Sequence, residues 1–221
     1  TQVSMDKLTE NIIKPSFYAA ERFRTVENMS KFNTEGYEIK RLSDIAVFVT
    51  ASRKSYMVSN NIKHISLLHI NNNCTINFNE VEKFEPISKG RSCVAGDLLF
   101  SKLNPRIPRM AVVPEKSYNL VCSNEFEIIK PIGEIDAYTL CFLLQTSNVK
   151  VQIESMTSGT SSSHSRIKRE QLGEILIPVP VGQRQITEMK KMGEKLKKAI
   201  EKIYLGENLI FEQQALLEKI S

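Results

Sequence analysis

A heptad repeat in the last forty residues constrains this chain more than any other feature. From Gln183 onward, apolar residues recur every seven positions, an interval that keeps one stripe of an α-helix facing a partner. The members of this row are Met189, Leu196, Ile203, Ile210 and Leu217. At ~1.5 Å rise per residue, about 37 residues would form a rod of roughly 55 Å. A rod of that length with an apolar seam requires a second helix beside it.

The neighbouring row leaves two packing arrangements open. It starts apolar and ends polar, through Ile186, Gly193, Ile200, Glu207 and Gln214. Either the helix breaks at Gly206 into a hairpin on its own domain, or its seam pairs with another long helix as a spacer or dimerisation device. We expect a kink at Gly206, because glycine costs about 1 kcal/mol relative to alanine in a helix interior.

The part of the chain before this helix has a β-rich pattern of short apolar runs separated by turns. Strands are predicted at Val47–Val49, Ile65–Ile70, Asp97–Phe100, Met110–Val113 and Glu125–Ile129, and helices at Pro15–Phe32, Asp136–Gln145 and Val149–Met156. The predicted fold class is therefore α+β: a β-rich mixed domain over residues 1–180, followed by a long helix of the coiled-coil type over residues 181–221.

Composition excludes several classes of protein. No apolar run approaches the eighteen residues of a membrane span, and no signal peptide is evident, so we expect a cytoplasmic chain with no membrane partner. The four cysteines lack any Cys-x-x-Cys pair and are predicted to be reduced core residues. His64, His69 and His164 lack the spacing of metal ligands, so no metal site is expected.

A run of small polar residues forms the first candidate binding loop. Nine of them occupy positions 157–165, and three cations follow. Such a stretch cannot bury apolar surface, so it is either a flexible linker or a loop whose hydroxyls, amides and cations contact nucleic acid. The candidates here are Ser158, Thr160, Ser161, Ser163, His164, Arg166, Lys168 and Arg169.

A second basic loop spans residues 101–109. It carries three cations without an acid, and two prolines stiffen it. Its candidate DNA-binding residues are Lys102, Asn104, Arg106 and Arg109. Asparagine and arginine can make bidentate contacts with adenine and guanine edges, respectively. One such loop alone is more typical of a solvated turn, but two on one chain favour nucleic-acid binding.

Enzyme signatures are missing from the sequence. The chain has no Gly-x-Gly-x-x-Gly motif, no P-loop, no Gly-x-Ser-x-Gly and no His-Glu-x-x-His. Asp44, Asp97 and Asp136 occur singly beside apolar runs, where turn or capping roles are typical. We therefore predict no catalytic residues and no cofactor in this chain.

The order of four motifs resembles the specificity subunit of type I restriction-modification systems. The motifs are Gly96–Pro105, Ser123–Phe126, Ser158–Thr160 leading to Arg166–Ile167, and Leu172–Pro180 followed by Gln183 and the long helix. The resemblance implies a target recognition domain joined to a spacer helix, as a half-length subunit or as part of a fused methyltransferase-specificity protein. It also implies double-stranded DNA, an adenine methyltransferase carrying S-adenosylmethionine, and a restriction subunit as partners, with a possible homodimer through the helix.

Two other functional classes stay open. The chain could be a coiled-coil scaffold or oligomerisation module without DNA binding, in which the serine-rich stretch is only a linker. It could also be an enzyme with an unrecognised site. DNA affinity separates the first alternative from the recognition hypothesis, because phosphate contacts make binding fall steeply with salt.

Overall fold

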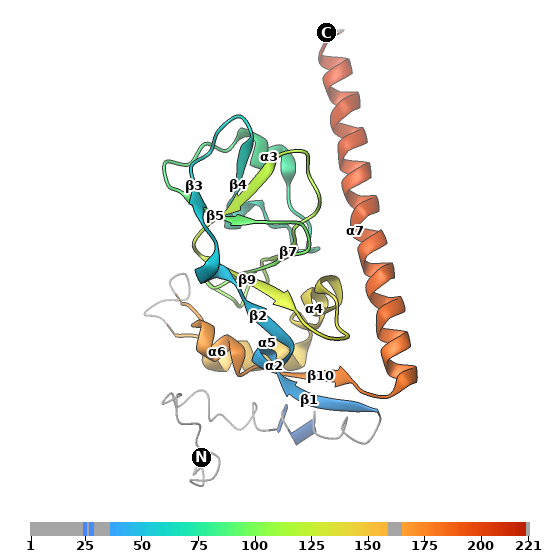
Figure 1. The fold of residues 1–221 in the computed structure, drawn as a ribbon. Helices are drawn as coiled ribbons and strands as arrows, with labels where there is room; N and C mark the ends of the chain where they lie inside the picture. Colours follow the sequence, from blue (N-terminus) through green and yellow to red (C-terminus); the bar gives the residue numbers. More distant parts are fainter. Residues whose placement is uncertain (1–23, 26, 29–35, 159–164, 220–221) are drawn as a thin grey trace.

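A central antiparallel sheet divides the body into two cores (Figure 1). This computed structural model describes residues 24–25, 27–28, 36–158 and 165–219. The predicted helix at Pro15–Phe32 lies largely outside the described residues. The central sheet has the order β2-β9-β6-β7, with the bounds β2 Ala46–Phe48, β9 Phe126–Pro131, β6 Leu98–Ser101 and β7 Met110–Val112.

Both faces of the central sheet are buried, and side chains alternate between them. Leu98 and Phe100 of β6 face a core shared with helices, while Leu99 between them faces the core of a second sheet. Successive side chains of a strand point to opposite faces. The uninterrupted apolar runs of β6 and β7 are therefore explained by burial on both faces.

The second sheet has the order β3-β5-β8-β4 and forms the far end of the body. Its strands are β3 Ser55–Tyr56, β5 Gly90–Cys93, β8 Asn119–Cys122 and β4 Ile62–Ile65, and its pairing is antiparallel except between β4 and β8. Three short helices accompany these strands: the 3₁₀ turns η4 Thr50–Ser52 and η5 Leu67–His69, and α3 Phe78–Lys83.

Short helices and a two-stranded ladder cover the other core. The elements are β1 Tyr37–Arg41, α2 Leu42–Ile45, α4 Ala137–Leu143, α5 Ser147–Met156, α6 Arg169–Gly173 and β10 Leu176–Pro180. β10 contains Pro178 and Pro180 and pairs only with β1. A ladder with one partner tolerates proline because each strand keeps an edge that needs no N–H donor.

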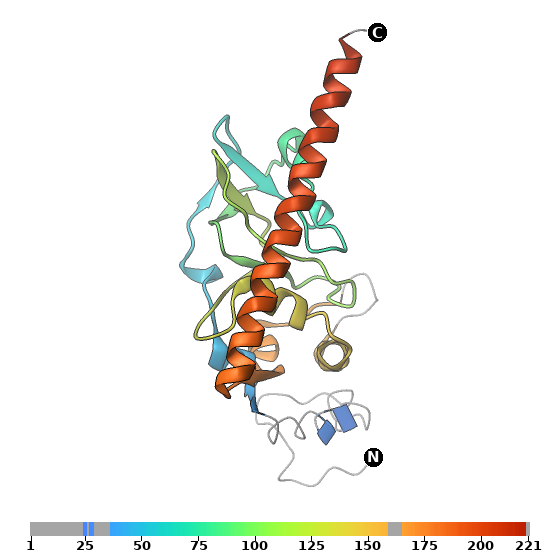
Figure 2. The same cartoon turned by 90° about the vertical axis from the view of Figure 1, so that its right-hand side faces the viewer.

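Helix α7, Gln183–Glu218, runs along the whole body and past its far end (Figures 1 and 2). It continues without a break through Gly193 and Gly206, so the hairpin alternative is wrong. Met189, Gly193 and Ile200 are buried against the body. Packing of this row on the body offsets the intrinsic cost of Gly193.

Several sequence predictions are confirmed and one is shifted. The strands β6, β7 and β9 and the helices α4 and α5 lie where the apolar runs predicted them. The strand expected at Ile65–Ile70 ends at Ile65, because the Ser66 hydroxyl accepts a hydrogen bond from the Leu68 N–H and begins a 3₁₀ turn. The fold class is α+β with a long C-terminal helix, as predicted. Among the described residues, no helix is long and apolar enough to cross a membrane.

Candidate nucleic-acid interface

The basic loop at residues 101–109 is the connection of a β-hairpin. It joins β6 to β7, and the Ser101 N–H donates to the Arg109 carbonyl at 3.0 Å, which extends the ladder into the loop. Pro105 is buried, whereas Arg106 is exposed. Asn104 has a φ of +45°, a left-handed conformation that is strained for a non-glycine residue and doubly so before proline.

The two ends of the serine-rich stretch meet at a narrow neck. Ser158 and Arg166 exchange two backbone hydrogen bonds, of 2.9 Å and 2.7 Å, so the chain closes on itself there. Thr157 and Ser165 are buried beside this neck, and the Thr157 hydroxyl donates to the Ile153 carbonyl. The candidates Thr160, Ser161, Ser163 and His164 lie outside the described residues.

The structure brings the two loops together. The Asn104 N–H donates to the Ser165 carbonyl at 2.8 Å, and the Ile167 N–H donates to the Lys102 carbonyl at 3.2 Å. Leu103 and Arg166 form an isolated antiparallel bridge between these bonds. The backbone contact to the Ser165 carbonyl helps to hold Asn104 in its strained conformation, a kind of strain that persists only where neighbouring structure imposes it.

Arg166 binds a carboxylate on a third segment, directly before β9. Its guanidinium contacts Glu125 through two hydrogen bonds, Nη2 to Oε1 at 2.9 Å and Nε to Oε2 at 3.1 Å. Hydrogen bonding from Arg166 lowers the pKa of Glu125, and the charge of Lys102 acts in the same direction. The Glu125 carbonyl also accepts from the Lys102 N–H at 2.9 Å. Residue 125 therefore joins both loops.

Arg169 is held in a second ion pair, which is more buried. Its Nη2 lies 2.8 Å from Oε1 of Glu127, a side chain that is 1% exposed. The Thr50 hydroxyl donates to the same oxygen at 2.6 Å. A buried carboxylate needs this compensation. Arg169 thus ties α6 to η4 and the central sheet, a positioning role that the sequence did not reveal.

Four of the candidate cations remain without an ion-pair partner within the described part of the chain. They are Lys102, Arg106, Arg109 and Lys168. Arg106 and Lys168 are exposed, and Lys102 and Arg109 are half-buried. The joined loops therefore offer cations, an exposed Ser158 hydroxyl and the side chain of Asn104 on one surface.

The apolar row predicted on α7 packs on the body near the start of the helix and is exposed to solvent near its end. Met189 is buried by the body and cannot join a seam with another helix, which corrects its assignment to the pairing row. Leu196 and Ile203 are half-buried at the flank of the body. Ile210 is 61% exposed and Leu217 is 66% exposed, where α7 extends beyond the body.

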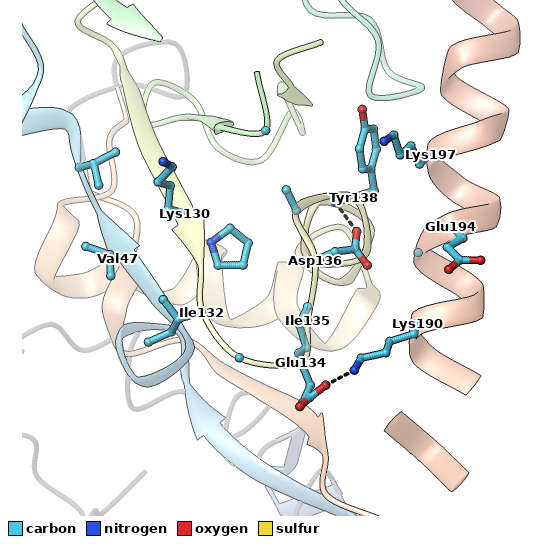
Figure 3. A pocket seen from close by; sticks show the side chains of 16 residues that line it. Val47, Lys130, Ile132, Glu134, Ile135, Asp136, Tyr138, Lys190, Glu194 and Lys197 are labelled. Atoms are coloured by element: carbon cyan, nitrogen blue, oxygen red, sulfur yellow. Dashed lines mark hydrogen bonds and ion pairs between the residues drawn. The ribbon is translucent and has the colours of Figure 1, made fainter. Parts of the chain in front are cut away.

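A groove lies between α7 and the body (Figure 3). Its volume is about 930 Å³, and its walls are the β9–α4 connection and one face of α7. Lys190 of α7 bonds Glu134 of that connection at 2.6 Å. No candidate DNA-binding residue lines the groove. The Lys190–Glu134 ion pair links α7 to the body there.

The fold has counterparts among solved structures. No protein-family model matches the sequence, and no curated protein matches it. The HsdS subunit from Thermoanaerobacter tengcongensis superposes with a TM-score of 0.50 and 18% identity, over 84% of this chain. A structure of the type I R-M system, described for its complex assembly and conformational transition, gives 0.53 and 17% over 82%. The type I restriction-modification S subunit from M. genitalium gives 0.52 and 14% over 81%.

The chain has the fold of a type I specificity subunit. The fold that the four sequence motifs implied is thereby confirmed. This chain covers 47%, 47% and 43% of the three matched chains, so it spans less than half the length of these S-subunit structures. The match includes most of the body that carries both candidate loops.

Proposed function

We propose that this chain recognises double-stranded DNA as one half of a type I specificity subunit, or as the recognition part of a fused methyltransferase-specificity protein. The observation that carries the proposal is the joining of two basic loops, far apart in sequence, by backbone hydrogen bonds between Lys102–Asn104 and Ser165–Ile167. A surface that presents cations, amides and hydroxyls from a rigid base suits phosphate and base-edge contacts.

Roles within the loops follow from their partners. Arg106, Arg109, Lys102 and Lys168 would contact phosphates, because their charges are not compensated within the described chain. Asn104 would read a base edge, since its backbone is held in a fixed, strained position. Arg166 and Arg169 would mainly position the loops, because carboxylates already bind them.

Helix α7 would act as the spacer that joins two recognition domains. A second seam lies roughly a quarter of a turn from the row buried on the body. Its members alternate at spacings of four and three: Met192, Leu196, Ala199, Ile203, Gly206, Ile210, Gln213 and Leu217. This is the heptad pattern of a coiled coil. The small residues Ala199 and Gly206 would let a partner helix approach closely.

The partners implied by this role are a DNA duplex, an adenine methyltransferase that carries S-adenosylmethionine, and a restriction subunit. The chain itself would contribute recognition and not the methyl-transfer chemistry. The helix on the other side of the seam would belong to a second copy of this chain or to the second half of a longer subunit.

Salt-dependent DNA binding tests the proposal. We expect the chain to bind a duplex with an affinity that falls linearly on a plot of log K against log salt, because each phosphate contact releases counterions. The four uncompensated cations predict a slope of about −3.6. A chain that oligomerises through α7 but has no measurable duplex affinity at low salt would be a scaffold, and the recognition proposal would be wrong.

A further inference from the structure

A cysteine occupies a left-handed backbone position in the turn between η5 and α3. Cys74 has a φ of +65°, and Asn104 is the only other non-glycine residue with a positive φ in the described part of the chain. The Cys74 N–H donates to the Asn71 carbonyl at 3.3 Å, and the Asn71 N–H donates to the Thr75 carbonyl at 2.9 Å. These bonds form a β-turn followed by a bulge, whose left-handed position is normally a glycine. The turn therefore accepts backbone strain to keep a side chain at position 74.

The thiol that this strain positions lies against a second thiol. Cys74 and Cys141 of α4 are 5% and 1% exposed, and both belong to the core shared with the helices. Their thiols form a hydrogen bond. Just after α4, the Gln145 Nε2 donates to Cys74 Sγ at 2.6 Å and to the Cys141 carbonyl at 3.2 Å, so one amide contacts both cysteines.

The contacts of Cys74 favour its thiolate. The hydrogen bond with Cys141 lowers the pKa of Cys74, and the Gln145 amide acts in the same direction, against the opposing effect of burial. The pKa of Cys141 is raised well above its ordinary value, first by the hydrogen bond with Cys74 and then by burial. Because the thiolate is the nucleophile in thiol oxidation, Cys74 is the attacking sulfur and Cys141 is a protonated thiol placed to resolve its oxidised form.

The other two cysteines provide an internal comparison. Cys93 lies opposite Leu120 in the β5–β8 ladder and Cys122 lies opposite Arg91, so the two cysteines are diagonal neighbours. Diagonal Cα atoms on such a ladder are about 7–8 Å apart, whereas disulfides join Cα atoms roughly 4.4–6.8 Å apart. The hydrogen bond with Cys122, together with burial, raises the pKa of Cys93 well above its ordinary value. This second pair therefore lacks both the geometry and the thiolate.

We propose that Cys74 and Cys141 are a peroxide-sensitive pair that closes to an intramolecular disulfide. The Cys74 thiolate attacks one oxygen of hydrogen peroxide and the O–O bond breaks, which leaves a sulfenic acid on Cys74. The departing hydroxide takes up the proton that the Cys74 thiol released and becomes water. The Cys141 sulfur then attacks the Cys74 sulfur, the S–O bond breaks, and a second water leaves with the Cys141 proton. The two thiols together lose two electrons, and the peroxide accepts them.

The disulfide joins two segments that hold α7. The turn that contains Cys74 leads to Ile76, whose N–H donates to the Tyr204 hydroxyl of α7 at 3.0 Å. Helix α4, which carries Cys141, packs its N-cap against Gly193 of α7. Oxidation therefore cross-links the two segments behind these contacts. The modification needs no DNA, so it goes beyond the proposed function and does not rest on it.

Peroxide treatment of the folded, fully reduced chain tests the proposal. We expect mass spectrometry under non-reducing conditions to find the peptide that contains Cys74 linked to the peptide that contains Cys141. The thermal midpoint should rise by about 5–10 °C and return on reduction, because the cross-link closes a long loop of the unfolded chain. Cys74→Gly suits the left-handed backbone, so this variant should fold and should lose both the linkage and the rise.

Cys93→Ser is the matched control, because it removes a buried thiol from the pair that is not expected to close. We expect it to keep both the Cys74–Cys141 linkage and the rise in thermal midpoint. A chain whose Cys74 stays reduced in peroxide, or one that links Cys93 to Cys122 as readily, would overturn the proposal. Sulfenic acid trapped on Cys74 by a dione reagent without any linkage to Cys141 would overturn it equally.

Discussion

Gly193 of α7 lies directly on the carboxylate of Asp136, the N-cap of α4. A Cβ atom at position 193 would overlap Oδ2 of Asp136 and would lie 2.5 Å from the Thr139 hydroxyl. Asp136 in turn accepts hydrogen bonds from the N–H groups of Tyr138 and Thr139, at 2.8 Å and 3.0 Å. The long helix therefore meets the body at a point that admits no side chain.

Gly193→Ala should destabilise the chain by about 1–3 kcal/mol, because either α7 moves away or Asp136 gives up its cap. Urea unfolding measures the change. Gly206→Ala is the control, since a Cβ at that position meets nothing within 4 Å. We expect it to stabilise the helix by about 1 kcal/mol. Equal effects of the two substitutions would contradict the close packing at Gly193.

Tyr204 fixes the far part of α7 to the second core. Its hydroxyl accepts a hydrogen bond from the Ile76 N–H at 3.0 Å, and its ring packs edge-on against Phe78 at 5.6 Å. Tyr204→Phe keeps the ring contact but leaves the Ile76 N–H without its acceptor. We expect a loss of about 1–2 kcal/mol in the free energy of unfolding. An unchanged stability would mean that water replaces the hydroxyl.

The exposed seam of α7 should be separable from its packing on the body. Ile210→Asp places a charge in the predicted helix pair, so we expect loss of self-association, or of binding to a partner helix, in sedimentation measurements. The folding of the chain should not change, because Ile210 is 61% exposed. Leu205→Asp is the matched control, equally exposed at 61% but outside the seam. If Leu205→Asp disrupts association as strongly, the seam is assigned to the wrong face.

Helix α7 shows which features of the fold could be predicted from the sequence and which could not. The seven-residue repeat predicts a long helix with an apolar row, and both are present. It does not say which row contacts the chain's own body, because that choice depends on whether a facing surface fits. The row that contains Gly193 faces the body, because only a glycine allows α7 to approach α4 so closely. This is the less apolar of the two rows, so Ile210 and Leu217 of the other row are left exposed.

The sequence predicted the two loops of the candidate site but not the contact that joins them. Cations and small polar residues at 101–109 and 157–169 indicated two loops. Their union depends on the pairing of Leu103 with Arg166, and no local pattern encodes a contact of such sequence separation. The carboxylates of Glu125 and Glu127 were missed for the same reason.

Substitutions of the two partners in the Arg166–Glu125 ion pair should change DNA affinity in opposite directions. Glu125→Gln removes a negative charge from the loops but keeps the backbone carbonyl that binds Lys102. We expect non-specific duplex affinity to rise about two- to fivefold, because the charge of Arg166 becomes available to phosphate. Arg166→Ala should lower affinity, since it leaves Glu125 uncompensated. Filter binding at low salt measures both, and a fall in affinity for Glu125→Gln would contradict the positioning role.

Acid should destabilise the second core through a buried histidine. Burial, reinforced by the nearby charge of His69, lowers the pKa of His64 from 6.5 to about 4. The unfolded chain then binds a proton that the folded chain does not, so stability is fully present above pH 6.5 and is lost as the pH falls toward 4. The loss amounts to at most about 3 kcal/mol.

His64→Phe checks the assignment of this acid transition. His64 is 3% exposed and packs edge-on against Phe84 at 5.6 Å, and its Nδ1 atom has no hydrogen-bond partner among the described residues. Phenylalanine fills similar space without a titratable group. We expect the fall in thermal midpoint between pH 6.5 and 4 to become shallower than in the unmodified chain. An unchanged pH profile would assign the acid sensitivity to other groups.

Sequence recognition by the joined loops is tested most directly by selection from a randomised duplex pool. The chain is co-expressed with an adenine methyltransferase from the same source, and the DNA that the complex retains is sequenced. We expect enrichment of a short motif, repeated as an inverted pair at a fixed spacing if α7 pairs two copies, and loss of the motif with Asn104→Ala. An assembled complex that enriches no sequence would contradict the recognition role.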